Sequence, residues 1–330
     1  MISLKSTKNR HLLLKTPEIR AVARIEAALL KGARKYFEYN NFHEVIVPSI
    51  TKATGSCENI DTLFETSFFG RTGYLRQTGQ LYLESLIPTL GNVYCIGPSF
   101  RAEPDVDNRH LTEFTLVEME FPGDFDMLLG HIENIIHSMI RNVLSKCKKD
   151  LEFLGVDLKR LEEVRPPFKK VTYTEAVEML SEDGVAWGDD LKSHHEKKLV
   201  EHFGGKPLFL THFPIEIKFF NMKRNPENPK IVNSADLLLP FSGEAVGAAE
   251  REYEYEEVLE RLKNSYMLKQ LENRGGSIED FKWYLDFLKE HGNVPHSGCG
   301  IGLNRVTQFV LGIDDIRAST VFPQNRESLL

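Results

Sequence analysis

Apolar and polar residues alternate with a period of two between Val93 and Phe121. The first part, VYCIGPSF, leads into a charged loop, and the second part, EFTLVEMEF, sets Glu118 and Glu120 between apolar neighbours. Successive side chains of a strand point to opposite faces, so the pattern predicts two strands with one apolar and one charged face. The same alternation places Arg101 and Glu103 on one side of the first strand. A polar ligand lying across the charged face would explain the pattern.

Two other stretches have the spacing of amphipathic helices. Pro17–Tyr39 repeats apolar residues at helical spacing, with Thr16 as a candidate N-cap and Pro17 in the first turn. Asp126–Cys147 has a continuous apolar side. The stretch from Phe42 to Pro48 predicts a strand that ends at the proline. Residues 74–91 predict a short strand followed by a helix that contains Gln80.

The second half of the chain begins with a polar stretch, residues 148–206, which predicts a small helical insertion. Strand patterns return at residues 208–210 and 215–220, and residues 232–252 then carry charged residues at a further site. Residues 253–269 and 280–290 predict helices. Ser297–Arg305 is rich in glycine and opens a further helix that runs to about Leu311, which places Arg305 in the first helical turn. Glycines before a helix let a ligand approach the backbone closely.

Composition narrows the class of protein without identifying it. The 330 residues are 41% hydrophobic and 27% charged, which is ordinary for a soluble globular protein. No apolar run is long enough to span a bilayer, and the N-terminal apolar stretch is too short for a signal peptide. The four cysteines are scattered without a CxxC pair, so neither zinc nor a disulfide framework is indicated and a cytoplasmic location is expected.

The net charge of −7 gives no overall attraction to nucleic acid. Residues 1–40 are basic, and two interpretations apply to them: an RNA-facing patch, or the solvated face of a helix, which is the commoner case and the one we favour.

Arginine and glutamate beside a charged loop suggest phosphate chemistry. Arginine presents a planar fork of donors that matches phosphate oxygens. Displacement at phosphorus develops charge that such donors stabilise. An exposed hairpin with solvated charges is the alternative, and a lone Phe-Arg-x-Glu string would favour it. Here the string continues without a gap through Arg109-His110-Leu111 and Glu113-Phe114.

That uninterrupted run, Phe100-Arg101-Ala102-Glu103 to Glu113-Phe114, resembles motif 2 of class II aminoacyl-tRNA synthetases of the asparaginyl/aspartyl subgroup. The resemblance implies that Arg101 binds the α-phosphate of ATP and that Glu103 contacts the adenine amino group. It also implies that Arg109 and His110 reach toward the β- and γ-phosphates. The helix of residues 17–39 and the strand ending at Pro48 resemble motif 1, which forms the dimer interface in that family.

The glycine-rich stretch, with Gly312–Arg317 and Val321-Phe322-Pro323 after it, resembles motif 3 of the same subgroup. The resemblance implies that Arg305 stacks on adenine and contacts the γ-phosphate, so Arg101 and Arg305 are the candidate catalytic residues. A cation over an aromatic base is physically favourable. Asp236 and Glu244 resemble the acids that bind metal in these enzymes, and Mg²⁺ prefers such oxygen ligands and bridges phosphates. Glu244 then also belongs to the ATP site.

The amino-acid site implied by the resemblance contains Glu58, Gln80, Glu120 and Arg251. Glu58 would bind the substrate ammonium, and a buried carboxylate suits that charge. For Glu58 and Gln80, a surface loop residue and a residue at the start of a helix are the alternatives. Leu83 stands where aspartyl enzymes carry a lysine, which favours asparagine over aspartate.

Four departures from the family pattern stand out. Asn304 replaces an acidic residue before the motif 3 arginine, Gly247-Ala248-Ala249 replaces a run of smaller residues, and Gln324 replaces an arginine. The alanine methyl groups should narrow a pocket that approaches the substrate. The family's anticodon-reading β-barrel needs about a hundred residues, whereas sixteen precede the helix at Pro17. We therefore expect a catalytic core over residues 1–330 with no anticodon-binding domain.

These observations predict an α+β fold, with an antiparallel sheet flanked by helices, and a homodimer formed through residues 17–48. The leading hypothesis is activation of asparagine by ATP and Mg²⁺, with tRNA as a possible acceptor. An ammonia-dependent asparagine synthetase acting through aspartyl-adenylate is the second hypothesis, favoured by the missing barrel. A non-catalytic amino-acid or nucleotide sensor is the third, and the intact arginines and acids argue against it.

Overall fold

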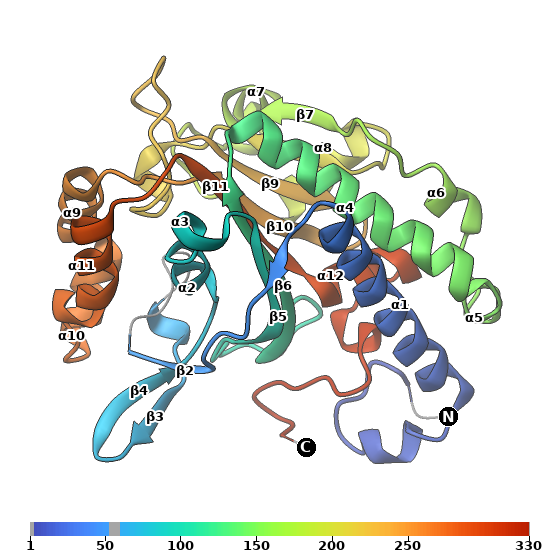
Figure 1. Cartoon of the computed structure of the whole chain (residues 1–330). Helices are drawn as coiled ribbons and strands as arrows, with labels where there is room; N and C mark the ends of the chain where they lie inside the picture. The colour runs from blue at the N-terminus through green and yellow to red at the C-terminus, as the bar shows by residue number, and fades with distance from the viewer. Residues whose placement is uncertain (1–2, 53–59, 330) are drawn as a thin grey trace.

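A large mixed sheet organises the molecule (Figure 1). The structure, a computed structural model, describes residues 3–52 and 60–329. The eight-stranded sheet contains, in spatial order, β1 (His43–Glu44), β5 (Val93–Phe100), β6 (Glu113–Pro122), β11 (His296–Gly302), β10 (Gly243–Glu250), β9 (Ser234–Leu239), β8 (Leu208–Thr211) and β7 (Lys169–Thr172). Its outermost pairs, β1–β5 and β7–β8, are parallel, and the pairs between them are antiparallel. The predicted α+β class is confirmed.

A smaller three-stranded sheet contains β2 (Ile50–Thr51), β4 (Arg71–Leu75) and β3 (Glu65–Phe68). The α-helices of the described chain are α1 (Pro17–Tyr39), α2 (Gln80–Glu84), α3 (Ile87–Leu90), α4 (Phe125–Lys146), α5 (Lys148–Phe153), α6 (Leu158–Glu162), α7 (Tyr173–Met179), α8 (Ser193–His202), α9 (Tyr255–Asn264), α10 (Tyr266–Asn273), α11 (Lys282–His291) and α12 (Leu303–Leu311). No described helix is both long and apolar enough to cross a membrane.

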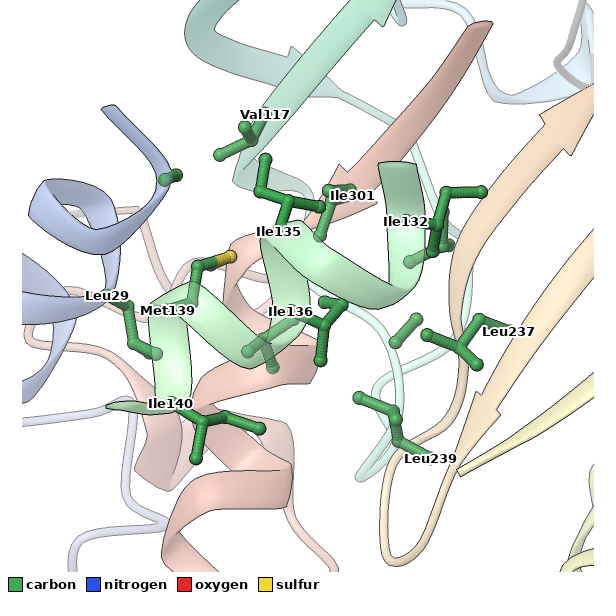
Figure 2. Close-up of a cluster of buried hydrophobic side chains, with 14 of the residues drawn as sticks. Leu29, Val117, Ile132, Ile135, Ile136, Met139, Ile140, Leu237, Leu239 and Ile301 are labelled. Carbon is green, nitrogen blue, oxygen red and sulfur yellow. The ribbon is translucent and has the colours of Figure 1, made fainter. Parts of the chain in front are cut away.

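Helix α4 builds the main core against the apolar face of the sheet (Figure 2). Its Ile132, Ile135, Ile136, Met139 and Ile140 lie among Val117, Leu237, Leu239 and Ile301 of the strands and Leu29 of α1. Complete burial of one such side chain contributes about 1.5–3 kcal/mol. Helices α1 and α12 pack into the same cluster, so this face of the sheet is covered. The opposite face is apolar at β8 and β9, where α7 and α8 pack against it, and carries the charged residues Glu118 and Glu120 at β6.

The predicted helix and strand limits agree well where a pattern is long. Helix α1 spans the predicted residues, and the Thr16 side chain accepts the N–H of Ile19 at 3.4 Å. Helix α4 begins one residue before the predicted start, after the cap Asp124. Strands β5 and β6 flank the charged loop as expected. Local pattern sufficed for these elements because each keeps one apolar face over many residues.

Three predicted elements were wrong in extent or type. The strand over residues 42–48 is only the two-residue β1, because the chain leaves the sheet edge before Pro48, which has no N–H to donate. Of residues 215–220, only Ile215–Ile217 form a 3-10 turn, and the carbonyl of Phe219, which follows the turn, accepts Arg261 Nη2 at 3.0 Å. The helix expected over 253–269 is two helices, since Ser265 caps α10 through the N–H of Leu268.

The segment 148–206 is not purely helical. It contains α5 to α8, but also β7, which pairs in parallel with β8 and extends the large sheet. Helix α8 packs against β9 and β10. The segment is therefore part of the large sheet, and the prediction of a purely helical insertion was wrong in this respect. The hydrophobic cluster around Tyr173 and Leu199 shares Leu208, Leu210 and Leu238 with the sheet.

Four of the nine lysines and arginines in the first forty positions form described ion pairs with acids. Arg34 pairs with Glu44 at 3.0 Å, Arg24 with Asp150 at 3.3 Å, and Lys5 with Asp314 at 3.5 Å. Such partners leave less positive charge for a phosphate backbone. The arrangement favours the solvated-face interpretation of this segment over an RNA-binding patch.

Candidate functional site

A cleft of about 1230 Å³ opens on the polar face of the large sheet. Its lining includes ten of the residues predicted from sequence: Gln80, Arg101, Glu103, Arg109, His110, Glu120, Asp236, Glu244, Arg251 and Arg305. They come from segments far apart in the chain, and β-pairing brings them together. Glu58, the eleventh, lies outside the described residues.

One end of the cleft is rich in arginine. Arg101 follows β5, with its guanidinium 5.1 Å from the centre of the Phe114 ring. Arg305 lies in the first turn of α12 and donates from Nη1 to the Ser242 carbonyl. Burial lowers the pKa of Arg305 to about 10, with the charge of Arg109 acting in the same direction. Arg305 therefore remains charged at neutral pH. Glu103 lines the same region.

The loop between β5 and β6 is organised by Asp107. Its carboxylate accepts the backbone N–H groups of Arg109 and His110 at 2.8 and 2.9 Å, and it contacts His110 Nδ1 at 2.7 Å. These hydrogen bonds lower the pKa of Asp107, outweighing the opposite effect of burial. The Arg109 side chain meets Glu196 of α8, with 3.1 Å between Nη2 and Oε2. These contacts give the loop a defined shape.

The two candidate metal-binding acids differ in their surroundings. Glu244 is exposed at the start of β10 and lines the cleft. Asp236 of β9 is buried, and its two oxygens lie 3.0 and 3.3 Å from Lys218 Nζ. Burial raises the pKa of Asp236 to about 7, although the charge of Lys218 opposes the shift. The oxygen donors suit Mg²⁺, but Lys218 already occupies part of the coordination capacity of Asp236. Glu244 is therefore the stronger candidate of the two.

The other end of the cleft holds a buried ionic cluster around Arg251. Its Nη2 lies 2.7 Å from Glu120 Oε1, and its Nε lies 3.9 Å from Glu84 Oε1. Glu84 also accepts Tyr284 Oη at 2.6 Å and Gln80 Nε2 at 2.6 Å. These contacts hold Gln80, Glu120 and Arg251 in fixed positions at the base of the cleft. His296 Nε2 completes the cluster, 3.4 Å from Glu84 Oε2.

Charges in this cluster offset one another. Burial alone would raise the pKa of Glu84, but the hydrogen bond and charge of His296 and the charge of Arg251 outweigh it and the pKa is lowered. Burial raises the pKa of Glu120 to about 7, against the attraction of Arg251, and Glu84 adds to the rise. Glu84, Glu120 and His296 could surround a metal by distance. The guanidinium beside them already supplies the positive charge, so a cation there would be repelled.

Glycines of β11 leave room for these acids. Gly298 pairs with Glu120 in the sheet register, and a methyl group on Gly298 would lie 2.0 to 2.1 Å from the Glu120 carboxyl group. Gly300 pairs with Glu118, whose oxygens accept the N–H of Gly79 at 2.9 and 3.0 Å and the Thr78 hydroxyl. Glu118 therefore holds the turn that starts α2 and carries Gln80.

The departures from the family pattern have structural explanations here. The Asn304 Oδ1 accepts the N–H of Thr115 at 3.2 Å and ties α12 to β6. Ala249 is buried beside Met222 and Val232, whereas Ala248 lines the cleft. Of the two alanine methyl groups, only that of Ala248 can therefore narrow the pocket as expected. Gln324 forms a bridge with Glu113, and its carbonyl accepts the N–H of Thr112 at 3.0 Å.

Sequence reasoning missed four contributors to the site: Glu84, His296, Tyr284 and Glu196. Glu84 lies within the stretch 74–91 and His296 directly precedes the glycine-rich stretch, and complete burial of both side chains is the feature that distinguishes them. Tyr284 comes from α11 and Glu196 from α8. Neither position shows a local signal, because the partner of each lies more than eighty residues away in sequence.

The sheet, its helical cover and the two-ended cleft are those of a class II tRNA synthetase core. The family model for class II tRNA synthetases (D, K and N) matches residues 4–326. An asparagine–tRNA ligase of Pelotomaculum thermopropionicum is 43% identical over 96% of this chain and 72% of its own length. The corresponding enzyme of Pyrococcus abyssi is 38% identical over 96% of this chain and 70% of its own length. The chain belongs to the class II tRNA synthetase family of the D, K and N group.

Solved structures give the same relationship. Asparaginyl-tRNA synthetase of Pyrococcus horikoshii, complexed with asparaginyl-adenylate, matches with a TM-score of 0.89 and 36% identity, over 97% of this chain and 72% of that one. The Entamoeba histolytica asparaginyl-tRNA synthetase, also complexed with asparaginyl-adenylate, matches with a TM-score of 0.85 and 30% identity, over 98% and 71%. The resemblance predicted from the sequence motifs is confirmed.

Proposed function

We propose that this chain activates asparagine with ATP to form asparaginyl-adenylate and pyrophosphate. The observation that carries the proposal is the two-ended cleft, with Arg101 and Arg305 at one end and the Glu120–Arg251 pair at the other. Relatives at up to 43% identity are asparagine–tRNA ligases, which supports asparagine as the amino acid. Leu83 is fully buried beside Val47 and Ile87, so the position where aspartyl enzymes carry a lysine offers no charge to a second substrate carboxylate.

The chemistry follows from the charges at each end. A carboxylate oxygen of asparagine attacks the α-phosphorus, the bond to the bridging oxygen breaks, and pyrophosphate leaves. The α-carboxyl group has a pKa near 3.5, so it is already ionised and needs no general base. Arg101 and Arg305 stabilise the charge that develops on the phosphate oxygens. Glu103, Arg109 and His110 contact the rest of the nucleotide.

We further propose that Glu244, with Asp236 once Lys218 yields, would hold a Mg²⁺ ion. Such an ion supplies charge neutralisation and orientation of the phosphates when it is bound. At the other end, Gln80, Glu120 and Arg251 bind asparagine, with Glu58 contacting its ammonium group. Transfer of the activated amino acid to tRNA is the proposed second step.

Amino-acid-dependent ATP–pyrophosphate exchange tests the activation step. We expect exchange with asparagine and much weaker exchange with aspartate, measured in parallel at equal concentrations. Exchange with aspartate alone, followed by release of free asparagine when ammonia is added, would contradict the proposal and support the ammonia-dependent synthetase. No exchange with either amino acid, together with ATP binding by calorimetry, would support a sensor.

We propose a homodimer formed through residues 17–48. Tyr39, at the end of α1, is 87% exposed, and Ile46, after β1, is 98% exposed. Exposed apolar groups that gather on one surface mark protein interfaces. Light scattering should give a dimer for the parent protein and a monomer for Ile46→Glu. Leu329→Glu, at a position that is 90% exposed, is the matched control and should stay dimeric. A monomeric parent at micromolar concentration would refute the proposal.

A further inference from the structure

Segment 148–206 contributes a side chain to the ATP end of the cleft. Glu196 lies in the first turn of α8, which packs against β9 and β10. The residue is only 9% exposed, although it comes from the most polar part of the chain. Burying a carboxylate in this way requires a partner charge to offset the lost hydration. The structure supplies that partner from the loop between β5 and β6.

The partner is Arg109. Its Nη2 lies 3.1 Å from Glu196 Oε2, and the two side chains are 26% and 12% exposed. The contact uses one of the three guanidinium nitrogens, so the arginine keeps donors for a phosphate. Partly buried ion pairs are screened less by salt than surface pairs. The Glu196 carboxylate therefore fixes the direction in which the Arg109 guanidinium points.

The turn between β9 and β10 is shaped to accept this pair. Gly243 has a φ of 69°, and a methyl group there would lie 2.6 Å from Glu196 Oε2 and 3.0 Å from Arg109 Nη2. A side chain at this position would displace both partners. The next residue is Glu244, the exposed acid of the proposed metal site. The pair thus sits directly beside the region assigned to the phosphates.

We propose that Glu196 is a positioning residue, which holds the Arg109 guanidinium in place to contact the phosphates of ATP. The inference rests on the proposed function, in which Arg109 is an ATP-binding residue. Without the carboxylate, the guanidinium on its long side chain must be ordered by the nucleotide itself, which weakens binding. The segment 148–206 accordingly has a direct part in nucleotide binding.

The test is steady-state exchange kinetics on Glu196→Gln. We expect the KM for ATP to rise about tenfold, equivalent to about 1.4 kcal/mol of binding free energy, because the nucleotide must then order the guanidinium itself. The KM for asparagine should change less than twofold. Glu196→Asp keeps the charge but shortens the side chain by one methylene, and it should shift the KM for ATP in the same direction. Glu201→Gln is the control, on the same helix and paired only with Lys197 among the ion pairs described.

A double-mutant comparison separates positioning from a structural role. In an Arg109→Gln background, Glu196→Gln should raise the KM for ATP no further. An equal rise in both backgrounds, or parallel rises in the KM for ATP and for asparagine, would overturn the inference. An unchanged KM for ATP in a folded Glu196→Gln protein would also overturn it.

Calorimetric titration with ATP keeps this test independent of turnover. If the parent protein binds ATP but shows no exchange with asparagine, the proposed function fails, and the affinity difference between parent and Glu196→Gln still decides the inference. If asparagine exchange is present and ATP affinity is unaffected by Glu196→Gln, the function stands and the positioning role is rejected.

Discussion

Replacing Arg305 with glutamine should lower the rate of asparagine-dependent exchange by about 100- to 1000-fold, the usual loss when one donor to a developing oxyanion is removed. Arg305 is the arginine that motif 3 and the start of α12 place in the cleft, and it stays charged because its lowered pKa of about 10 is still far above neutrality. Arg305→Lys keeps the charge but loses the planar fork, so its rate should lie between those of the parent and the glutamine variant.

The control for this experiment is Arg165→Gln. Arg165 is exposed and donates only to the Glu162 carbonyl among the hydrogen bonds described, at 3.3 Å. The measurement is exchange at saturating ATP and asparagine, with thermal melting of each variant to establish that it is folded. A folded Arg305→Gln protein with more than a tenth of the parent rate would show that Arg305 does not contact the reacting phosphates.

Glu84→Gln should destabilise the protein by about 3–5 kcal/mol, the range for removal of one partner from a buried ionic group. Glu84 is fully buried, accepts Tyr284 and Gln80 at 2.6 Å, and lies within ion-pair distance of Arg251 and His296. Its loss leaves those positive groups with Glu120 alone. We also expect weaker asparagine binding, because Arg251 and Gln80 lose the group that orients them.

Urea unfolding and the KM for asparagine measure the two effects. Tyr284→Phe removes one hydrogen bond and leaves the charges, so its destabilisation should be smaller than that of Glu84→Gln. Glu290→Gln, at an exposed position on α11, should leave both quantities unchanged. Equal stability of Glu84→Gln and the parent would mean that the cluster is not an important source of stability.

The predicted site residues come together because of the register in which the strands of the large sheet pair, although the residues are far apart in sequence. Motif resemblance indicated Arg101, Glu244 and Arg305 as parts of one site, and the structure places them in one cleft. Resemblance alone did not show that Asp236 is already paired with Lys218. Nor could the resemblance show that Glu84 contacts both Gln80 and Arg251. Glu84 belongs to α2, whereas Arg251 follows the last residue of β10 and His296, its other partner, begins β11.

The sequence by itself determined the long elements and the family. Helices α1 and α4 and strands β5 and β6 follow from periodicity, since a repeated apolar face over many residues outweighs local exceptions. Short segments depended on their surroundings. Residues 215–220 have a strand-like composition, yet Ile215–Ile217 form a 3-10 turn and Arg261 binds the Phe219 carbonyl. Residues 169–172 form β7 because they pair with the edge of β8.

Only the tertiary structure decided which charges meet. Burial raises the pKa of Glu120 to about 7, and the fold brings Glu120 of β6 and Glu84 of α2 to Arg251. The tertiary structure also brings Glu196 of the segment 148–206 to Arg109, which lies 87 positions away in the sequence. Coulomb interactions and desolvation depend on distance in space, which sequence spacing does not encode, so these contacts became visible only in the folded molecule.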